Sequence, residues 1–153
     1  MDFSRVFTLG SVLDFNSSIL NPVYTKTSVE ISKEQLNGKA FIVFGAVDFH
    51  SKIYVNGELA GEHFGGYTTF RIDATPFLKE GENVITVYAE DDVRDYHQAR
   101  GKQSELFYSH GCDYTRTTGI WQTVWLEFVP KNYIKQVKIT PFVDENRAVV
   151  DVK

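Results

Sequence analysis

Residues 39–63 read KAFIVFGAVDFHSKIYVNGELAGEH and contain the clearest β-sheet signals of the chain. The run 39–47 is almost continuously apolar and rich in Phe and Val, which predicts a strand buried on both faces. A short alternating segment then leads into Asn56-Gly57. This dipeptide is the strongest two-residue hairpin signal, because both central positions of a type I′ turn need positive φ. Residues 58–63 are therefore the predicted returning strand.

Short strands and turns continue after this hairpin. Residues 69–73, 83–89 and 120–128 are further predicted strands. Between the first two, Thr75 is predicted to cap a single helical turn that has proline at its first position and ends at Gly81. The sequence has no long amphipathic helical pattern. Many short strands with frequent turns predict an all-β fold, a β-sandwich.

Length and composition limit the classes of protein to consider. The 153 residues suit one domain, or one domain plus a fragment of another, and 42% apolar residues can build a sizeable core. Sixteen basic and twenty acidic side chains give a net charge of −4, which argues against a general nucleic-acid binder. The single cysteine, Cys112, excludes an internal disulfide. No apolar run approaches the roughly 20 residues of a membrane span, and no signal peptide is expected. These observations leave the compartment of the protein open.

The two ends of the chain differ from its middle. Residues 1–22 show little that can be assigned. Residues 133–141 and 148–152 are two predicted strands joined by a turn, and two strands cannot hold a core of their own. We therefore expect three parts: an unassigned segment 1–22, a sandwich domain 23–130, and a tail 131–153 that begins a second, truncated β-sandwich.

Residues 90–118 form a long polar segment dense in charge. Connections of this length in compact domains are usually functional or disordered. Four aromatic residues lie within this segment, which favours order. Its last part, GCDYTRTT at 111–118, places an acid, a base and a phenol directly before a predicted core strand.

Three stretches of the sequence resemble a known family. GAVDFHSKIYVNGELAGEHFGGYTTFRIDATPFLKEGENVITV, then ARGKQ, then YTRTTGIWQTVWLE resemble the N-terminal sugar-binding domain of glycoside hydrolase family 2. That family contains β-galactosidases, β-glucuronidases and β-mannosidases. The resemblance covers roughly residues 23–130, and the tail resembles the start of the family's next, immunoglobulin-like domain. Residues 1–22 depart from the usual opening of the family.

This resemblance implies a jelly-roll, galactose-binding-domain-like sandwich that packs beside a TIM barrel. A retaining glycosidase needs two carboxylates about 5–5.5 Å apart, and in this family both lie on the barrel, hundreds of residues downstream. We therefore expect no catalytic residue here and no hydrolysis by this chain alone. The full-length protein is expected to be a β-galactosidase-like hydrolase that acts on a β-galactoside or a related carbohydrate, needs no cofactor and could form a homo-oligomer.

Two other functions remain open. The alternative is a free-standing carbohydrate-binding module that stacks sugars on Trp121, Trp125 or Tyr114. The third is a purely structural domain that makes subunit contacts. For the tryptophans, which share one face of the predicted strand, packing in the core or against another domain is the favoured interpretation.

Asp113 is the first candidate for substrate binding. It lies six residues before Gly119, where the resemblance implies an acid that reaches into the barrel's active site in galactosidases and glucuronidases. A carboxylate can accept charge-assisted hydrogen bonds from two vicinal hydroxyls of a sugar. By its residue type alone, an aspartate in a loop would rather stabilise its own turn.

Asp48 is the second candidate, because related galactosidases place Asn or Asp after the equivalent strand, facing the same pocket. Its ordinary role would be a turn former or a partner for a backbone N–H. If Asp48 and Asp113 converge, they could bind a sugar hydroxyl or a monovalent cation. Two carboxylates are too few for Ca²⁺, which takes six to eight oxygens.

Arg116 and Tyr114 complete the candidate substrate-binding residues. For Arg116 a salt bridge that holds the loop is favoured over sugar contact, and for Tyr114 a buried anchor is favoured over stacking on a sugar. Residues 100–103 match a family motif and are expected to position the loop against the barrel. Asp91, with its acidic neighbours, is predicted to lie in a solvated patch. The histidines lack zinc-ligand spacing, so no metal site is expected.

Overall fold

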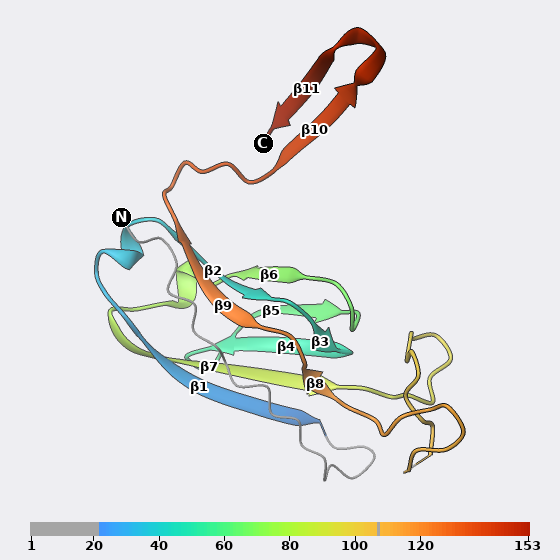
Figure 1. Ribbon diagram of the computed structural model, residues 1–153. Helices are drawn as coiled ribbons and strands as arrows, with labels where there is room; N and C mark the ends of the chain where they lie inside the picture. Colours follow the sequence, from blue (N-terminus) through green and yellow to red (C-terminus); the bar gives the residue numbers. More distant parts are fainter. Residues whose placement is uncertain (1–21, 107) are drawn as a thin grey trace.

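The computed structural model in Figure 1 describes residues 22–106 and 108–153, and these form a sandwich of antiparallel sheets with an additional hairpin. The first sheet has the strand order β1-β7-β4-β5. Its strands are β1 (Val23–Ile31), β4 (His50–Val55), β5 (Glu58–Phe64) and β7 (Gly81–Glu90). The predicted all-β sandwich is confirmed.

The second layer has the order β6-β2-β9 and is continued by the short pair β3-β8. Its strands are β2 (Lys39–Phe44), β3 (Val47–Asp48), β6 (Phe70–Asp73), β8 (Gly119–Ile120) and β9 (Val124–Val129). Three single-turn helices connect strands in the described part of the chain: η1 (Gln35–Asn37), η2 (Thr75–Phe77) and η3 (Val143–Glu145). None of the helices in the described ranges is long and apolar enough to cross a membrane.

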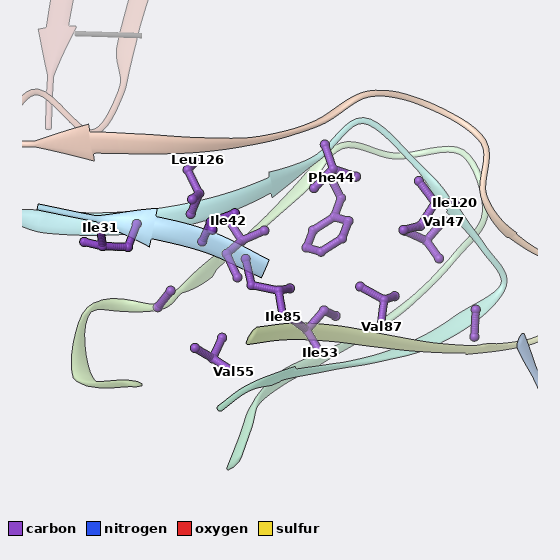
Figure 2. Packing of buried hydrophobic residues seen from close by; sticks show 14 residues of the cluster. Ile31, Ile42, Phe44, Val47, Ile53, Val55, Ile85, Val87, Ile120 and Leu126 are labelled. Atoms are coloured by element: carbon purple, nitrogen blue, oxygen red, sulfur yellow. The ribbon is translucent and has the colours of Figure 1, made fainter. Parts of the chain in front are cut away.

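The core lies between the two layers and follows the period of two that strands impose (Figure 2). Ile42 and Phe44 of β2 point into it opposite Ile85 and Val87 of β7. The outer face of β2 is also covered. There the Arg71 guanidinium lies over the Phe41 ring, with its central carbon 4.7 Å from the ring centroid. The Phe41 ring also packs against the ring of Tyr133, which follows β9. The prediction that this strand is buried on both faces is confirmed.

The Asn-Gly hairpin joins β4 to β5 as predicted. Asn56 and Gly57 have φ angles of 52° and 88°, the left-handed values that a type I′ turn needs. The Asn56 side chain also ties this turn to β7, because it accepts a hydrogen bond from Val84 N at 3.0 Å and donates one to Asn83 Oδ1 at 2.9 Å. The turn therefore contributes to the register of the first sheet.

Two predicted elements differ from the structure. Thr75 does not cap its helical turn; its Oγ1 accepts a hydrogen bond from Ala40 N at 3.0 Å and so joins η2 to β2. The predicted strand 120–128 is interrupted at 121–123, where the side chains are exposed. Gly45 N donates to Thr123 O at 2.8 Å across this interruption, which matches the gap between β2 and β3. The gap between β8 and β9 therefore lies opposite the gap between β2 and β3.

The tail forms a hairpin of β10 (Val137–Phe142) and β11 (Arg147–Val152), which projects away from the sandwich in Figure 1. Every side chain of β11 is exposed, and β10 pairs with β11 alone in the described part of the chain. Except for Pro22, the unassigned segment 1–22 lies outside the described residues.

Candidate functional site

The polar segment between β7 and β8, residues 91–118, lies at one end of the sandwich (Figure 1), and we call it the polar loop. Backbone hydrogen bonds give it internal order. Tyr114 N donates to Lys102 O at 2.7 Å, and Ser104 N donates to Tyr114 O at 2.8 Å, which makes a short parallel bridge between residues 103 and 114. A tight turn directly precedes Tyr114 in the sequence, and it is closed by a hydrogen bond that Asp113 N donates to His110 O at 2.9 Å.

Asp48 lies where the sandwich meets this loop. It is the last residue of β3, pairs with Gly119 of β8 and is only 5% exposed. Its Oδ2 accepts a hydrogen bond from Gln103 Nε2 at 2.6 Å, and its Oδ1 is enclosed without a partner among the described residues. Burial raises the pKa of Asp48, and the hydrogen bond from Gln103 opposes that increase.

Asp91 is the second acid of this region. The prediction of a solvated acidic patch agrees with the exposure of Asp92 and Asp95, but it is wrong for the enclosed carboxyl of Asp91. Its Oδ1 accepts a hydrogen bond from Gln98 Nε2 at 2.7 Å, and its Oδ2 is buried without a partner in the described ranges. Burial, followed by the negative charge of Asp48, raises the pKa of Asp91 to about 7. The buried residues of β7 are odd-numbered, and Asp91 continues that inward face past the strand end, so the sequence held a usable signal.

Asp113 contrasts with Asp48. Its side chain is half-buried, and its carboxylate accepts no hydrogen bond from any described residue. No hydrogen bond joins the Asp48 and Asp113 side chains within the described ranges either. Gln103 instead joins Asp48 to the polar loop, because its side chain bonds Asp48 Oδ2 and Thr117 N and its backbone neighbours bridge to Tyr114. The sequence predicts that residues 100–103 position this loop against the barrel.

Tyr114 and Arg116 both hold the polar loop through hydrogen bonds. The Tyr114 ring is 67% exposed, so it is the Tyr114 backbone and not a buried ring that anchors the loop. The Arg116 guanidinium donates to two backbone carbonyls, those of Glu105 at 3.2 Å and Leu106 at 3.3 Å. Burial, followed by the nearby charge of Arg94, lowers the pKa of Arg116.

Trp121 lies outside the core, at 41% exposure, in the interruption between β8 and β9. Its indole N–H donates to Gly66 O at 2.8 Å, and its ring meets that of Tyr67 edge-on with centroids 6.1 Å apart. Gly66 in turn packs on Asp48, because a Cβ added there would lie 2.3 Å from Oδ1. Burial, followed by the charges of Asp48 and Asp91, raises the pKa of Tyr67.

Within residues 22–106 and 108–153, no group of three or more His, Cys, Asp or Glu side chains is placed to hold a metal ion. What the region offers chemically is the half-buried carboxylate of Asp113 on a hydrogen-bonded loop that also carries exposed aromatic rings, such as that of Tyr114. Such groups bind hydroxylated, ring-shaped ligands.

Comparison with known proteins gives a consistent picture. The sequence model of the family described as "Glycosyl hydrolases family 2, sugar binding domain" matches residues 12–130. The chain is 36% identical over 136 residues to a putative β-glucuronidase of Formosa agariphila, covering 84% of this chain and 15% of the relative. It is 39% identical over 101 residues to a β-galactosidase of Thermoanaerobacter pseudethanolicus, covering 65% of this chain and 12% of the relative.

Solved structures share the fold. A β-glucuronidase of Ruminococcus gnavus superposes with a TM-score of 0.72 at 17% identity, over 95% of this chain and 27% of that one. A β-glucuronidase of an uncultured Clostridium gives 0.69 at 23% identity, over 88% and 24%. The chain thus spans about a quarter or less of each protein named here.

Proposed function

The chain belongs to glycosyl hydrolase family 2, as its sugar-binding domain, and we propose that it lends Asp113 to a sugar pocket completed by another domain. The domain itself is non-catalytic in this proposal. The whole protein would be a retaining β-galactosidase-like enzyme, with a β-galactoside or a related β-glycoside as substrate. Names of both β-galactosidases and β-glucuronidases among the relatives support this substrate class.

The free carboxylate of Asp113 carries the proposal. The loop around it uses backbone bonds, Arg116 and Gln103 to satisfy its own polar groups, while the Asp113 carboxylate accepts nothing from the described residues. An ionised carboxylate can accept hydrogen bonds from two neighbouring hydroxyls, and such charge-assisted bonds are about twice as strong as neutral ones. A pyranose offers that pair of donors.

The burial of Asp48 supports a non-catalytic role. A general acid or base must come within hydrogen-bond reach of the reacting group. Asp48 has one oxygen on Gln103 and the other against Gly66, so neither oxygen is available to a substrate. We therefore assign the two catalytic carboxylates to a barrel domain that this chain does not include.

The β10–β11 hairpin supports the presence of further domains. Apolar side chains are exposed on both strands, among them Ile139, Val149, Val150 and Val152. A two-stranded hairpin is marginally stable without further strands or a covering layer. We propose that residues 131–153 begin an immunoglobulin-like domain whose other strands cover these side chains.

The test is Asp113→Ala in the complete gene product that carries this chain. Activity is measured as kcat/KM on p-nitrophenyl β-D-galactoside and β-D-glucuronide. We expect a loss of about 10–100-fold on the preferred substrate, because a hydrogen bond to a charged group contributes about 1.5–3 kcal/mol. Asp144→Ala, in the exposed η3 turn, is the matched control and should leave kcat/KM unchanged. Equal activity of the wild type and Asp113→Ala would remove Asp113 from the pocket.

A carbohydrate-binding module is the second candidate, favoured by the exposure of Tyr114 and Trp121. Calorimetry of the 153-residue chain with galactose and glucuronic acid separates the two functions. A dissociation constant in the millimolar range or below favours the module, whereas the absence of binding favours a pocket that needs the second domain.

A further inference from the structure

We infer that Gln103 is the positioning residue of the Asp113 loop, because its side-chain amide joins the loop backbone to the buried Asp48. The inference rests on the proposed role of Asp113, and it assigns to Asp48 an indirect role: Asp48 holds Gln103 and does not touch the sugar. The sequence, in contrast, predicts Asp48 as a substrate ligand.

The Gln103 side chain makes a hydrogen bond at each end of its amide. Its Nε2 donates to Asp48 Oδ2 at 2.6 Å, and its Oε1 accepts from Thr117 N at 2.7 Å. This pair of contacts needs a hydrogen-bond donor and an acceptor at the end of one side chain, and the glutamine amide has both. One amide thus links β3 to the backbone four residues after Asp113.

The Asp48 end of this link is rigid. Asp48 is held in the β3–β8 ladder opposite Gly119, and its Oδ1 packs against Gly66 so closely that no Cβ fits there. The carboxylate therefore has one orientation, with Oδ2 facing the loop. A buried acceptor of fixed position is a suitable anchor for a long, exposed connection.

The other end of the link lies beside Asp113. The backbone on either side of Gln103 forms the parallel bridge to Tyr114, through Lys102 O and Ser104 N. Tyr114 follows Asp113 directly, so the Gln103 segment holds the loop immediately after Asp113 and again at Thr117. Displacement of Gln103 would move the peptide that carries the Asp113 carboxylate.

The charges around Gln103 are consistent with this role. The amide lies near two acids, since it donates to Asp48, whose negative charge in turn helps to raise the pKa of Asp91. A neutral NH₂ group has two hydrogens to donate and adds no charge. Glutamate at this position would bring a third carboxylate to the same place.

An exchange of the two functional groups tests the inference. Gln103→Glu keeps the length and the acceptor for Thr117 N but removes the donor to Asp48. In the double variant Asp48→Asn/Gln103→Glu, the amide introduced at position 48 can donate to the carboxylate introduced at position 103, while the amide oxygen stays against Gly66. The double variant has the same number of carboxylates as the wild type. Gln136→Glu, in the exposed linker before β10, is the matched amide-to-acid control.

The first measurement is amide hydrogen exchange of the 153-residue chain by NMR. We expect the backbone amide hydrogens of Thr117 and Tyr114 to exchange about 10-fold faster or more in Gln103→Glu. In the double variant their exchange rates should return to within about 3-fold of those in the wild type. Ile85, in the sandwich, and the Gln136→Glu control should not change. Gln103→Met, which has a similar length and adds no charge, should loosen the same two amides, and it serves if Gln103→Glu does not fold.

The second measurement is kcat/KM of the same variants in the complete gene product on the p-nitrophenyl glycosides. Loss in Gln103→Glu with recovery in the double variant supports the inference. Unchanged exchange in Gln103→Glu and Gln103→Met, or loosening that the double variant fails to reverse, overturns it. If exchange follows the expected pattern but Asp113→Ala is fully active, the positioning stands and the sugar role of Asp113 is wrong. If Asp113→Ala loses activity while exchange never changes, the proposed function stands and the positioning is wrong.

Discussion

The sandwich and the polar loop are held by different forces. Residues of the sandwich core such as Ile42, Phe44 and Ile53 are fully buried, whereas in the described part of the loop only Val93 and Ser104 are buried. Apolar burial stabilises the sandwich through many contacts, whereas the loop is held mainly by hydrogen bonds. Substitutions in the sandwich should therefore change global stability, and substitutions in the loop should change local position.

The largest expected effect is that of Phe44→Ala. Phe44 is fully buried and stacks on Phe70 with ring centroids 4.8 Å apart. Its removal should lower the free energy of unfolding by about 3–5 kcal/mol, through lost burial and the cavity left behind. Urea denaturation measures this value. Tyr96→Ala, at a ring 93% exposed on the polar loop, is the control and should change stability by less than about 0.5 kcal/mol. Similar losses in both variants would contradict the division between sandwich and loop.

Gly66→Ala should give the next largest effect, because it acts where the two regions meet. The added methyl would lie 2.3 Å from Asp48 Oδ1, so Asp48 or the Gly66 backbone must move. We expect a loss of about 1–3 kcal/mol in unfolding free energy. The contact is isolated by a double-mutant cycle. In an Asp48→Ala background the same substitution should have much less effect, and an undiminished loss there would exclude the clash with Asp48.

A smaller effect concerns pH and Asp91. Its pKa rises from 3.8 to about 7 on folding, so between these values the folded state binds more protons than the unfolded state. The contribution of Asp91 to the free energy of unfolding is therefore fully present below about pH 4 and is lost as the pH rises to about 7. Allowing for the partial exposure of the carboxyl, we expect about 1–2 kcal/mol over this range. Asp91→Asn should remove this decrease, as measured by urea denaturation from pH 4 to 8. Identical pH profiles for both proteins would show that Asp91 titrates normally.

The same division explains what the sequence could predict. Strand periodicity and the Asn-Gly turn are local signals, and the strands around Asn56-Gly57 appear as predicted. Strand β1 was missed, although Val23–Ile31 alternates, because its inward residues include two threonines and give a weaker apolar pattern. The interruption at 121–123 was also missed, because it depends on pairing with residues 45–46.

The site was predicted less well because its contacts are non-local. Asp48 and Gln103 are 55 positions apart, and no spacing rule connects them. The resemblance to family 2 directed attention to Asp48 and Asp113 but implied that both face one pocket. In the structure, Asp48 is buried and bonded to Gln103, whereas the Asp113 carboxylate is half-buried and accepts no hydrogen bond from a described residue.

The most direct test of the central claim is a cycle between Asp113 and the hydroxyls of the substrate. Wild type and Asp113→Ala, as complete gene products, are compared on p-nitrophenyl β-D-galactoside and on its monodeoxy analogues. If Asp113 binds a hydroxyl, the substitution should lower kcat/KM about 10–100-fold on the parent, but by no more than about 3-fold on the analogue that lacks that hydroxyl. An equal loss on every substrate, or no loss on the parent, would contradict the account.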